Sequence, residues 1–421
     1  MPSKDSKKTI FTKMRRTLRR VSCFVLVLAL ALPSSALAKD EKPVIHAGYR
    51  TLASSLPSER LMLHMGVWYP TLRRPSTVKV ANWSFRAARN APIYNGPWPV
   101  IILSHDVTGD AWAHHNLAAS LARRGFIVAA PTHDHDNWAD MRMLWSDREL
   151  PLRAVQLRAA LDVVLEHKQI GPQADASRVG YLGFGLTAPA GLLLAGASLT
   201  PDGWKNFVEK QKAQKEGTQS PWLKPFVMER MDSLVASMRH RAEERQEKTA
   251  MMHRANESRS KLFQRLEEST SRTHQRQMRL ARASDISCPP AVLPLLPPLS
   301  HDRALADKRF KAFALVSPGY AMLFNRQSLF EVREPVFLAG AGKDGFNLPH
   351  EQAETLRDML PQRPYYLFLP DADMAAFHAP APTTDVAKAL GGIYKSAPQT
   401  SASYSALLEA LHHFFEHSLA Q

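Results

Sequence analysis

The sequence predicts an α/β fold, a doubly wound, mostly parallel sheet with an inserted helical segment. Short apolar runs alternate with longer stretches of helical periodicity, and the alternation stops near residue 203 and resumes near residue 310. A strand that is buried on both faces shows a continuous apolar run, and strands that alternate with helices favour a parallel sheet with right-handed crossovers.

The elements follow in order on both sides of the interruption. We expect strands at 48–52, 65–71, 100–104, 126–131 and 179–183, with helices at 112–124, 151–168 and 187–198. After the interruption we expect strands at 313–316, 335–340 and 365–369, with helices at 350–360 and 403–418. Gly125 is expected to end the helix that precedes it.

The interruption, 203–300, divides the predicted domain into a first part, 39–202, and a second part, 301–421. It is polar, contains no strand-like run, and closes with a proline-rich stretch at 288–298. Apolar residues recur there at helical spacing, which predicts a basic helical insertion, a cap or an arm. A lid over a pocket, a partner-binding arm and a solvated hairpin without specific chemistry all fit this pattern.

Residues 1–38 have the three parts of a secretory signal peptide. A basic stretch ends at Arg20, the apolar run Val21–Leu32 follows, and Ala36-Leu37-Ala38 forms a cleavage site. The apolar run is about 12 residues long, whereas a spanning helix needs roughly 20. We expect cleavage after Ala38, a periplasmic or secreted protein, and no stable membrane span after cleavage.

The net charge of +15 comes from two segments only. Residues 1–38 contribute +7 and residues 205–282 contribute +8, so the remainder is close to neutral. No nucleic-acid reading motif accompanies the charge, and we therefore expect no nucleic-acid partner. Cleavage would remove Cys23 and leave Cys288 alone, which excludes an internal disulfide.

Several short motifs resemble one branch of the α/β-hydrolase superfamily, the platelet-activating-factor acetylhydrolase-like or "predicted dienelactone hydrolase" branch. The resemblance covers roughly 45–200 and 305–417. It rests on the order of Tyr49–Leu52, Val67–Pro70, Leu103–His105, Val128–Pro131, Arg178–Leu186 and Pro335–Asp344. It implies carboxylic-ester hydrolysis by a serine, a histidine and an acid, without a cofactor.

The nucleophile position is degenerate. The family pattern G-x-S-x-G places serine on a sharp strand-to-helix turn. Here Gly183 matches the first glycine, Gly185 falls on the serine, and Thr187 stands where a glycine follows. Glycine has no side chain, so nucleophilic catalysis from this position is impossible.

The resemblance assigns the acid position to Asp344. The histidine position falls on Met374, which cannot transfer a proton near neutral pH. His378 lies four residues further on, and in a helical turn it would project from the same face. A displaced base and a packing histidine are both open interpretations of His378.

The family usually shows His-Gly after the oxyanion strand, and this chain has Ser104-His105-Asp106-Val107. The backbone N–H groups of Val107 and Leu186 are the expected oxyanion hole. A carboxylate at Asp106 would oppose oxyanion stabilisation, where one donor is often worth about 3–4 kcal/mol. Ser104 and His105 are a poor nucleophile–base pair because adjacent strand residues face opposite ways.

Residues 132–136 are dense in metal-ligand types, and in an extended loop His133 and His135 would point the same way. A metal site needs three or four convergent ligands, so we expect a hydrogen-bonded loop and no metal. With His105 and Asp106, these histidines should form the rim of the pocket. His114 and His115 begin a helix, where we expect surface positions.

Together these features favour a non-catalytic, exported α/β-hydrolase derivative, a pseudoenzyme. It would bind an ester-like lipid, another envelope ligand, or a protein partner through 203–300. Two alternatives stay open. One is an active ester hydrolase that uses a displaced constellation of Asp344 and His378, and the other is an envelope interaction protein that acts through its basic insertion.

Overall fold

A computed structural model describes residues 43–56, 61–81, 83–107, 109–138, 140, 143, 148–200, 203, 305–379 and 402–420. The expected signal peptide and, apart from Gly203, the expected insertion 203–300 lie outside these residues. The chain divides after Val44, and the description below concerns the unit from Ile45 to Gln421. In the parts of the chain described, no helix has the length and apolar character needed to span a bilayer.

The described strands form one sheet in the order β10-β9-β8-β7-β5-β6-β2-β1-β4-β3. Six neighbouring strands run parallel, as predicted. They are β5 (Trp98–Ser104), β6 (Ile127–Thr132), β7 (Ala174–Phe184), β8 (Phe310–Val316), β9 (Val336–Ala341) and β10 (Tyr365–Leu369). Their residues are largely buried on both faces, which explains why they are continuous apolar runs in the sequence.

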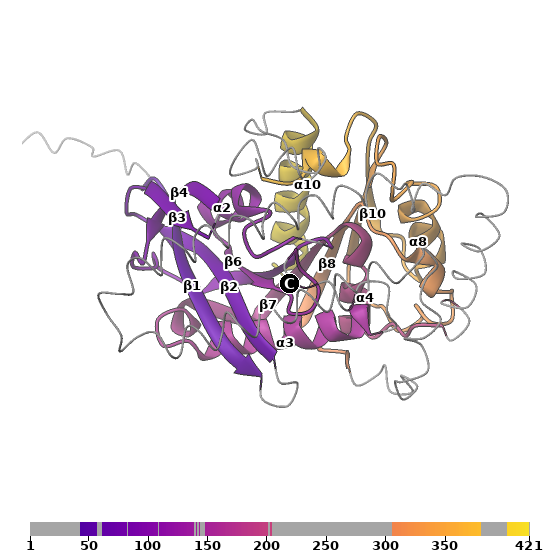
Figure 1. The fold of residues 1–421 in the computed structure, drawn as a ribbon, viewed down its shortest axis with the longest axis horizontal. Helices are drawn as coiled ribbons and strands as arrows, with labels where there is room; N and C mark the ends of the chain where they lie inside the picture. Colours follow the sequence, from indigo (N-terminus) through magenta and orange to yellow (C-terminus); the bar gives the residue numbers. More distant parts are fainter. Residues whose placement is uncertain are drawn as a thin grey trace, which may run out of the picture. The chain divides into compact units, whose positions relative to one another are not determined.

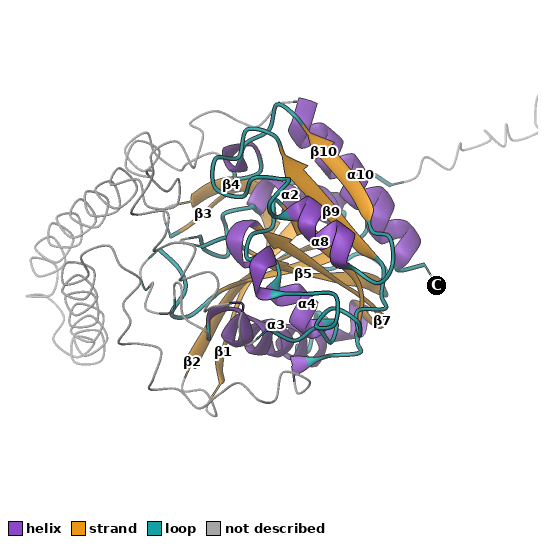
Figure 2. Cartoon of the chain, turned by 90° about the vertical axis from the view of Figure 1, so that its right-hand side faces the viewer, coloured by secondary structure: helices purple, strands orange, loops and turns teal. Residues whose placement is uncertain are grey.

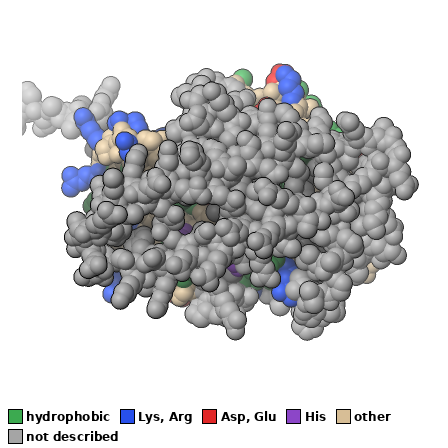
Figure 3. All heavy atoms as spheres, in the orientation of Figure 1, with side chains coloured by type: hydrophobic (Ala, Val, Ile, Leu, Met, Phe, Trp, Pro, Cys, Tyr) green, Lys and Arg blue, Asp and Glu red, His purple; other side chains and the backbone are tan. Residues whose placement is uncertain are grey.

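The N-terminal strands extend this sheet and make it mixed. β1 (His46–Leu56) pairs antiparallel with β2 (Leu61–Thr71), and β2 pairs antiparallel with β6. A hairpin of β3 (Ser76–Val80) and β4 (Trp83–Arg89), which the sequence did not predict, completes the sheet, with β4 parallel to β1. In β4, buried Trp83 and Phe85 alternate with exposed residues such as Arg86. Figure 3 shows Lys and Arg side chains gathered where Figure 1 places this hairpin.

Helices cover both faces of the sheet, as a doubly wound fold requires. One apolar layer holds α2 (His115–Arg123) and α10 (Ala402–Ser418). The other holds α3 (Glu149–Glu166), α4 (Ala190–Leu194) and α8 (Ala353–Met359). Figure 2 shows α10 and α8 on opposite sides of β9 and β10. Gly125, with φ +93°, follows α2 as predicted, whereas the helix expected at 187–198 is shorter than predicted.

The strand order changes direction at β5. The chain leaves β5 for β6 on one side and returns to β7 on the other, so the carboxyl ends of β5 and β7 lie side by side. The register pairs Ser104 with Gly183 at this edge. Ligands of open α/β sheets bind at such a switch point. The fold therefore brings residues 104–107 and 184–187 together at the position where a site is expected.

Candidate functional site

The turn after β7 has the geometry of a nucleophile elbow but lacks the side chain. β7 ends at Phe184, and the chain passes into a short 3₁₀ turn, η2 (Gly185–Thr187). Gly185 has φ +62°, in the left-handed region that glycine enters without the steric cost of a Cβ atom. The backbone turn is thus present at Gly185, without any group that can attack a substrate.

The carboxylate of Asp106 fills the space where a side chain at position 185 would stand. A Cβ atom built on Gly185 would lie 2.0 Å from Cγ of Asp106. It would lie 2.1 and 2.2 Å from the two carboxylate oxygens. Real Cβ atoms essentially never approach other atoms within 3.0 Å. Gly185 and Asp106 are therefore a matched pair, in which the missing side chain makes room for the carboxylate.

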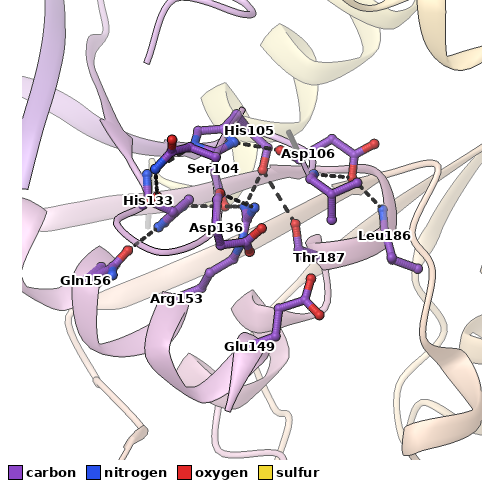
Figure 4. Close-up of polar contacts among 12 residues, drawn as sticks. Ser104, His105, Asp106, His133, Asp136, Glu149, Arg153, Gln156, Leu186 and Thr187 are labelled. Carbon is purple, nitrogen blue, oxygen red and sulfur yellow. Dashed lines mark hydrogen bonds and ion pairs between the residues drawn. The ribbon is translucent and has the colours of Figure 1, made fainter. Parts of the chain in front are cut away.

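The same carboxylate occupies both expected oxyanion donors. Oδ1 of Asp106 accepts the N–H of Val107 at 2.7 Å and the N–H of Leu186 at 2.8 Å (Figure 4). These distances match those of donors that stabilise a developing oxyanion. The two N–H groups therefore converge on one point, and the protein's own carboxylate is bound there.

The environment of Asp106 makes it titrate near neutral pH. Burial, with a smaller contribution from nearby Asp344, raises the pKa of the Asp106 carboxyl to about 7. The N–H donors of Val107 and Leu186 and the charge of Arg153 oppose that rise in pKa. His105 holds the loop in place, because its Nδ1 donates to the Asp106 carbonyl at 2.6 Å.

The structure does not bring the expected acid and base together. Oδ2 of Asp344 accepts from Ser317 Oγ at 2.6 Å, and its Oδ1 accepts the N–H groups of Phe346 and Asn347. None of these partners is a histidine. Nδ1 of His378 donates instead to the carbonyl of Met374 at 2.9 Å.

Comparisons with known proteins bear on the fold alone. No family model matches the chain, and no curated protein does. A ferulic acid esterase from Streptomyces cinnamoneus is similar in structure, with a TM-score of 0.50 and 14% identity over 91% of this chain and 92% of that chain. A dienelactone hydrolase from Anabaena variabilis is similar at a TM-score of 0.41 and 11% identity, over 88% of this chain and 98% of that chain.

The chain has an α/β-hydrolase fold. The strand order and the elbow agree with that assignment, and they confirm the fold predicted from the resemblance.

Within this α/β-hydrolase fold, a group of histidines is buried behind the site. His114 and His115 are only 2% and 7% exposed, so our expectation of surface positions was wrong. The His114 ring stacks on Phe184 with centroids 3.7 Å apart and on His378 at 4.8 Å. Burial lowers the pKa of His115 to about 3 and that of His378 to about 4. His378 is thus a buried imidazole that stacks on His114 and donates to the Met374 carbonyl.

A second polar network lies at the same edge of the sheet. His133 Nδ1 donates to Gln156 Oε1 at 2.8 Å, since the Gln156 Nε2 donates to the Asp134 carbonyl. His133 Nε2 is then the acceptor for the Ser104 hydroxyl at 2.9 Å. A hydroxyl, an imidazole and an orienting amide form the arrangement that activates a nucleophile. Ser104 and His133 are both 0% exposed, however, so no substrate reaches them in this conformation.

A buried cation joins this network to the site. Nε of Arg153, on α3, lies 2.5 Å from Oδ2 of Asp136. Its Nη1 donates to Ser104 Oγ at 3.1 Å and to the carbonyl of His105. The sequence did not single out Arg153, whose only signal is a cation among the apolar residues of a predicted helix. It also did not indicate the pairing of Ser104 with His133, because Ser104 ends β5 and His133 lies in the loop after β6.

The two histidines of residues 132–136 point in different directions, contrary to our expectation. His133 is buried in the network above. His135 has φ +65°, which turns the chain, and its side chain is 22% exposed. Its Nδ1 lies 2.9 Å from Oδ2 of Asp140. The expected rim positions therefore separate into buried His105 and His133, and half-buried Asp106 and His135.

Proposed function

We propose that this protein is an exported, non-catalytic α/β-hydrolase derivative, which binds a ligand at the former active site and does not turn over esters. The observation that carries the proposal is the Asp106 carboxylate, which accepts from both Val107 N–H and Leu186 N–H in the space beside Gly185. Export is inferred from the sequence pattern of residues 1–38.

Acyl transfer has two requirements that the elbow does not meet. Acyl transfer needs a nucleophile, and position 185 supplies none. It also needs hydrogen-bond donors that stabilise negative charge as it develops, and here an existing carboxylate occupies them. While Asp106 is ionised, a second negative charge at that point would be repelled.

Hydrolysis of p-nitrophenyl esters tests the catalytic half of the proposal. The mature chain, 39–421, is assayed on short- and long-chain esters against an unfolded control. We expect no turnover above that control. Turnover that is lost in Asp344→Ala would contradict the proposal and support the displaced constellation of Asp344 and His378.

A reconstructed variant makes a negative result informative. Asp106→Gly with Gly185→Ser supplies a hydroxyl and vacates the donors, and Met374→His supplies a base. Gain of ester turnover in this triple variant, with none in the double variant Gly185→Ser, Met374→His, supports the interpretation that Asp106 blocks the site. Equal turnover in both variants would count against it.

The binding half of the proposal is tested on the protein as purified. An ester-like lipid or a related envelope ligand is the class that the resemblance implies. Organic extraction followed by mass spectrometry should recover such a ligand from folded 39–421. The substitution Leu186→Trp should obstruct the former site. If the ligand is recovered from this variant in unchanged amount, the ligand does not bind at the former site.

A further inference from the structure

We propose that Asp134, His135 and Asp140 form a binding site for a divalent transition-metal cation. The three residues come from the loop after β6, next to the former active site but separate from the elbow. Each offers one ligand atom, and the three atoms all lie within 4.8 Å of one another. Our sequence analysis considered His133 and His135 as the ligand pair, and the structure groups His135 with two carboxylates instead.

The distances fit the coordination shell of a metal ion. Nδ1 of His135 lies 2.9 Å from Oδ2 of Asp140 and 3.6 Å from Oδ1 of Asp134. Ligand atoms that sit about 2.0–2.2 Å from a common zinc ion are themselves separated by roughly 3 Å or slightly more. A cation therefore fits among the three atoms with only small side-chain rotations.

The three side chains are accessible to solvent on one side. The exposed fractions are 30% for Asp134, 22% for His135 and 14% for Asp140. An ion can therefore enter from solvent, and water or an anionic ligand can complete its coordination. Three protein ligands with an open position is the pattern of metal sites that take an exogenous ligand.

Buried groups hold the loop in shape before any ion binds. Gln156 Nε2 donates to the carbonyl of Asp134 at 3.1 Å, and Gln156 is itself oriented by His133. Asn137 Nδ2 donates to the carbonyl of His133 at 2.7 Å, and Asn137 Oδ1 accepts the N–H of Asp140 at 3.2 Å. Preorganisation of this kind reduces the entropy that ligand side chains lose on binding.

The donor set selects the class of ion. One imidazole nitrogen and two carboxylate oxygens suit Zn²⁺ or Mn²⁺, whereas Ca²⁺ and Mg²⁺ prefer oxygen ligands alone. The competing explanation is a hydrogen-bonded histidine–aspartate cluster that binds no ion. The two explanations differ in whether the isosteric change Asp140→Asn alters metal affinity.

A pair of histidines elsewhere in the chain could also bind a metal ion and has to be replaced before the titration. His413 and His417 lie one turn apart on α10, with ring centroids 4.0 Å apart. Such a pair on a helix surface can chelate transition metals by itself. The parent for all measurements is therefore the mature chain that carries His413→Asn and His417→Asn.

Isothermal titration of this parent with ZnCl₂ and, separately, MnCl₂ tests the proposal. We expect one site per chain for at least one of the two ions. Asp140→Asn and His135→Ala should each weaken affinity at least tenfold. Asp371→Asn, at an exposed aspartate on a different loop that pairs with Lys343, is the matched control and should leave it unchanged.

Circular dichroism and urea unfolding establish that each variant is folded. Absence of stoichiometric binding of either ion to folded parent protein overturns the proposal. Equal affinities in the parent and in folded Asp140→Asn and His135→Ala overturn it as well. The d–d absorption of bound Co²⁺ gives a second readout that does not depend on the calorimetric signal. It should appear in the parent and be reduced in Asp140→Asn.

Discussion

Two polar sites at the carboxyl edge of the sheet have complementary defects. At the elbow, Val107 and Leu186 present two convergent N–H donors to the half-buried carboxylate of Asp106, and position 185 supplies no hydroxyl. One strand away, Ser104 and His133 form a hydroxyl–imidazole pair with an orienting amide, and both are fully buried. One site has the donors without a nucleophile, and the other has a nucleophile without access.

The comparison of these two sites shows that residue types alone do not define a catalytic site. The Ser104 pair is nearly complete by composition and hydrogen bonding, yet Arg153 and Asp136 seal it as part of the core. The elbow is incomplete by composition but lies where the fold places ligands. Four predictions follow from this comparison. They test whether the Ser104–His133 network is structural and whether Gly185 and Asp106 at the elbow are a fitted pair.

The largest effect should follow removal of the buried cation. Arg153→Met leaves the carboxylate of Asp136 buried and uncompensated, which should lower the free energy of unfolding by about 3–5 kcal/mol. Urea unfolding measures it. Arg158→Met, on the same helix, is the control, because Arg158 is 39% exposed and its Nε lies 3.8 Å from Asp307 Oδ2. We expect Arg158→Met to lower the free energy of unfolding by less than about 1 kcal/mol. Equal decreases in the two variants would contradict a structural role for the network.

Acid should destabilise the protein by a comparable amount. Burial is the main cause of lowered pKa values in five core histidines: His105, His114, His115, His133 and His378. Unfolding exposes these groups, and below about pH 6.5 the unfolded chain binds protons that the folded chain does not, so stability falls. Asp106 and Asp110, with pKa values raised to about 7 and about 6, act in the opposite direction.

Five histidines against two aspartates leave a net loss of stability between pH 7 and pH 5. Urea unfolding at a series of pH values measures it. His115→Phe should flatten the profile, since the ring already stacks on Phe85 with centroids 4.8 Å apart. A profile that rises toward pH 5 would show that the buried histidines are not the dominant groups.

A methyl group at the elbow should cost less, roughly 2–3 kcal/mol. Gly185→Ala adds a Cβ atom at a positive φ and against Asp106. Asp106→Gly should recover part of this loss in the double variant, which a double-mutant cycle measures as coupling. Gly345→Ala is the control, because a Cβ atom there meets nothing within 4 Å. Strict additivity of the changes at 185 and 106 would contradict the fitted pair.

The smallest effect should come from the buried hydroxyl. Ser104→Ala removes the hydrogen bond to His133 and the one from Arg153, whose Nη1 keeps the His105 carbonyl as an acceptor, and should lower the free energy of unfolding by about 1–2 kcal/mol. Because Ser104 is sealed in the core, the change should leave ligand recovery and ester assays as they are. Loss of any ester turnover in this variant alone would show that the sealed pair opens and reacts.

The fold followed from the sequence because continuous apolar runs mark the parallel strands, whereas the elbow followed from the resemblance of Gly183 and Gly185 to the family motif. The sealed network did not follow, since its members come from β5, the loop after β6, and α3, and their contacts depend on packing. The β3–β4 hairpin was missed because its strands are short and alternate between buried and exposed residues.

The overlap between a Cβ atom at 185 and the Asp106 carboxylate also makes the two positions interdependent in any redesign of this turn. A side chain introduced at 185 displaces the carboxylate from the N–H groups of Val107 and Leu186. The residue at 106 therefore decides which side chains position 185 accepts, and the two positions have to be changed as a pair.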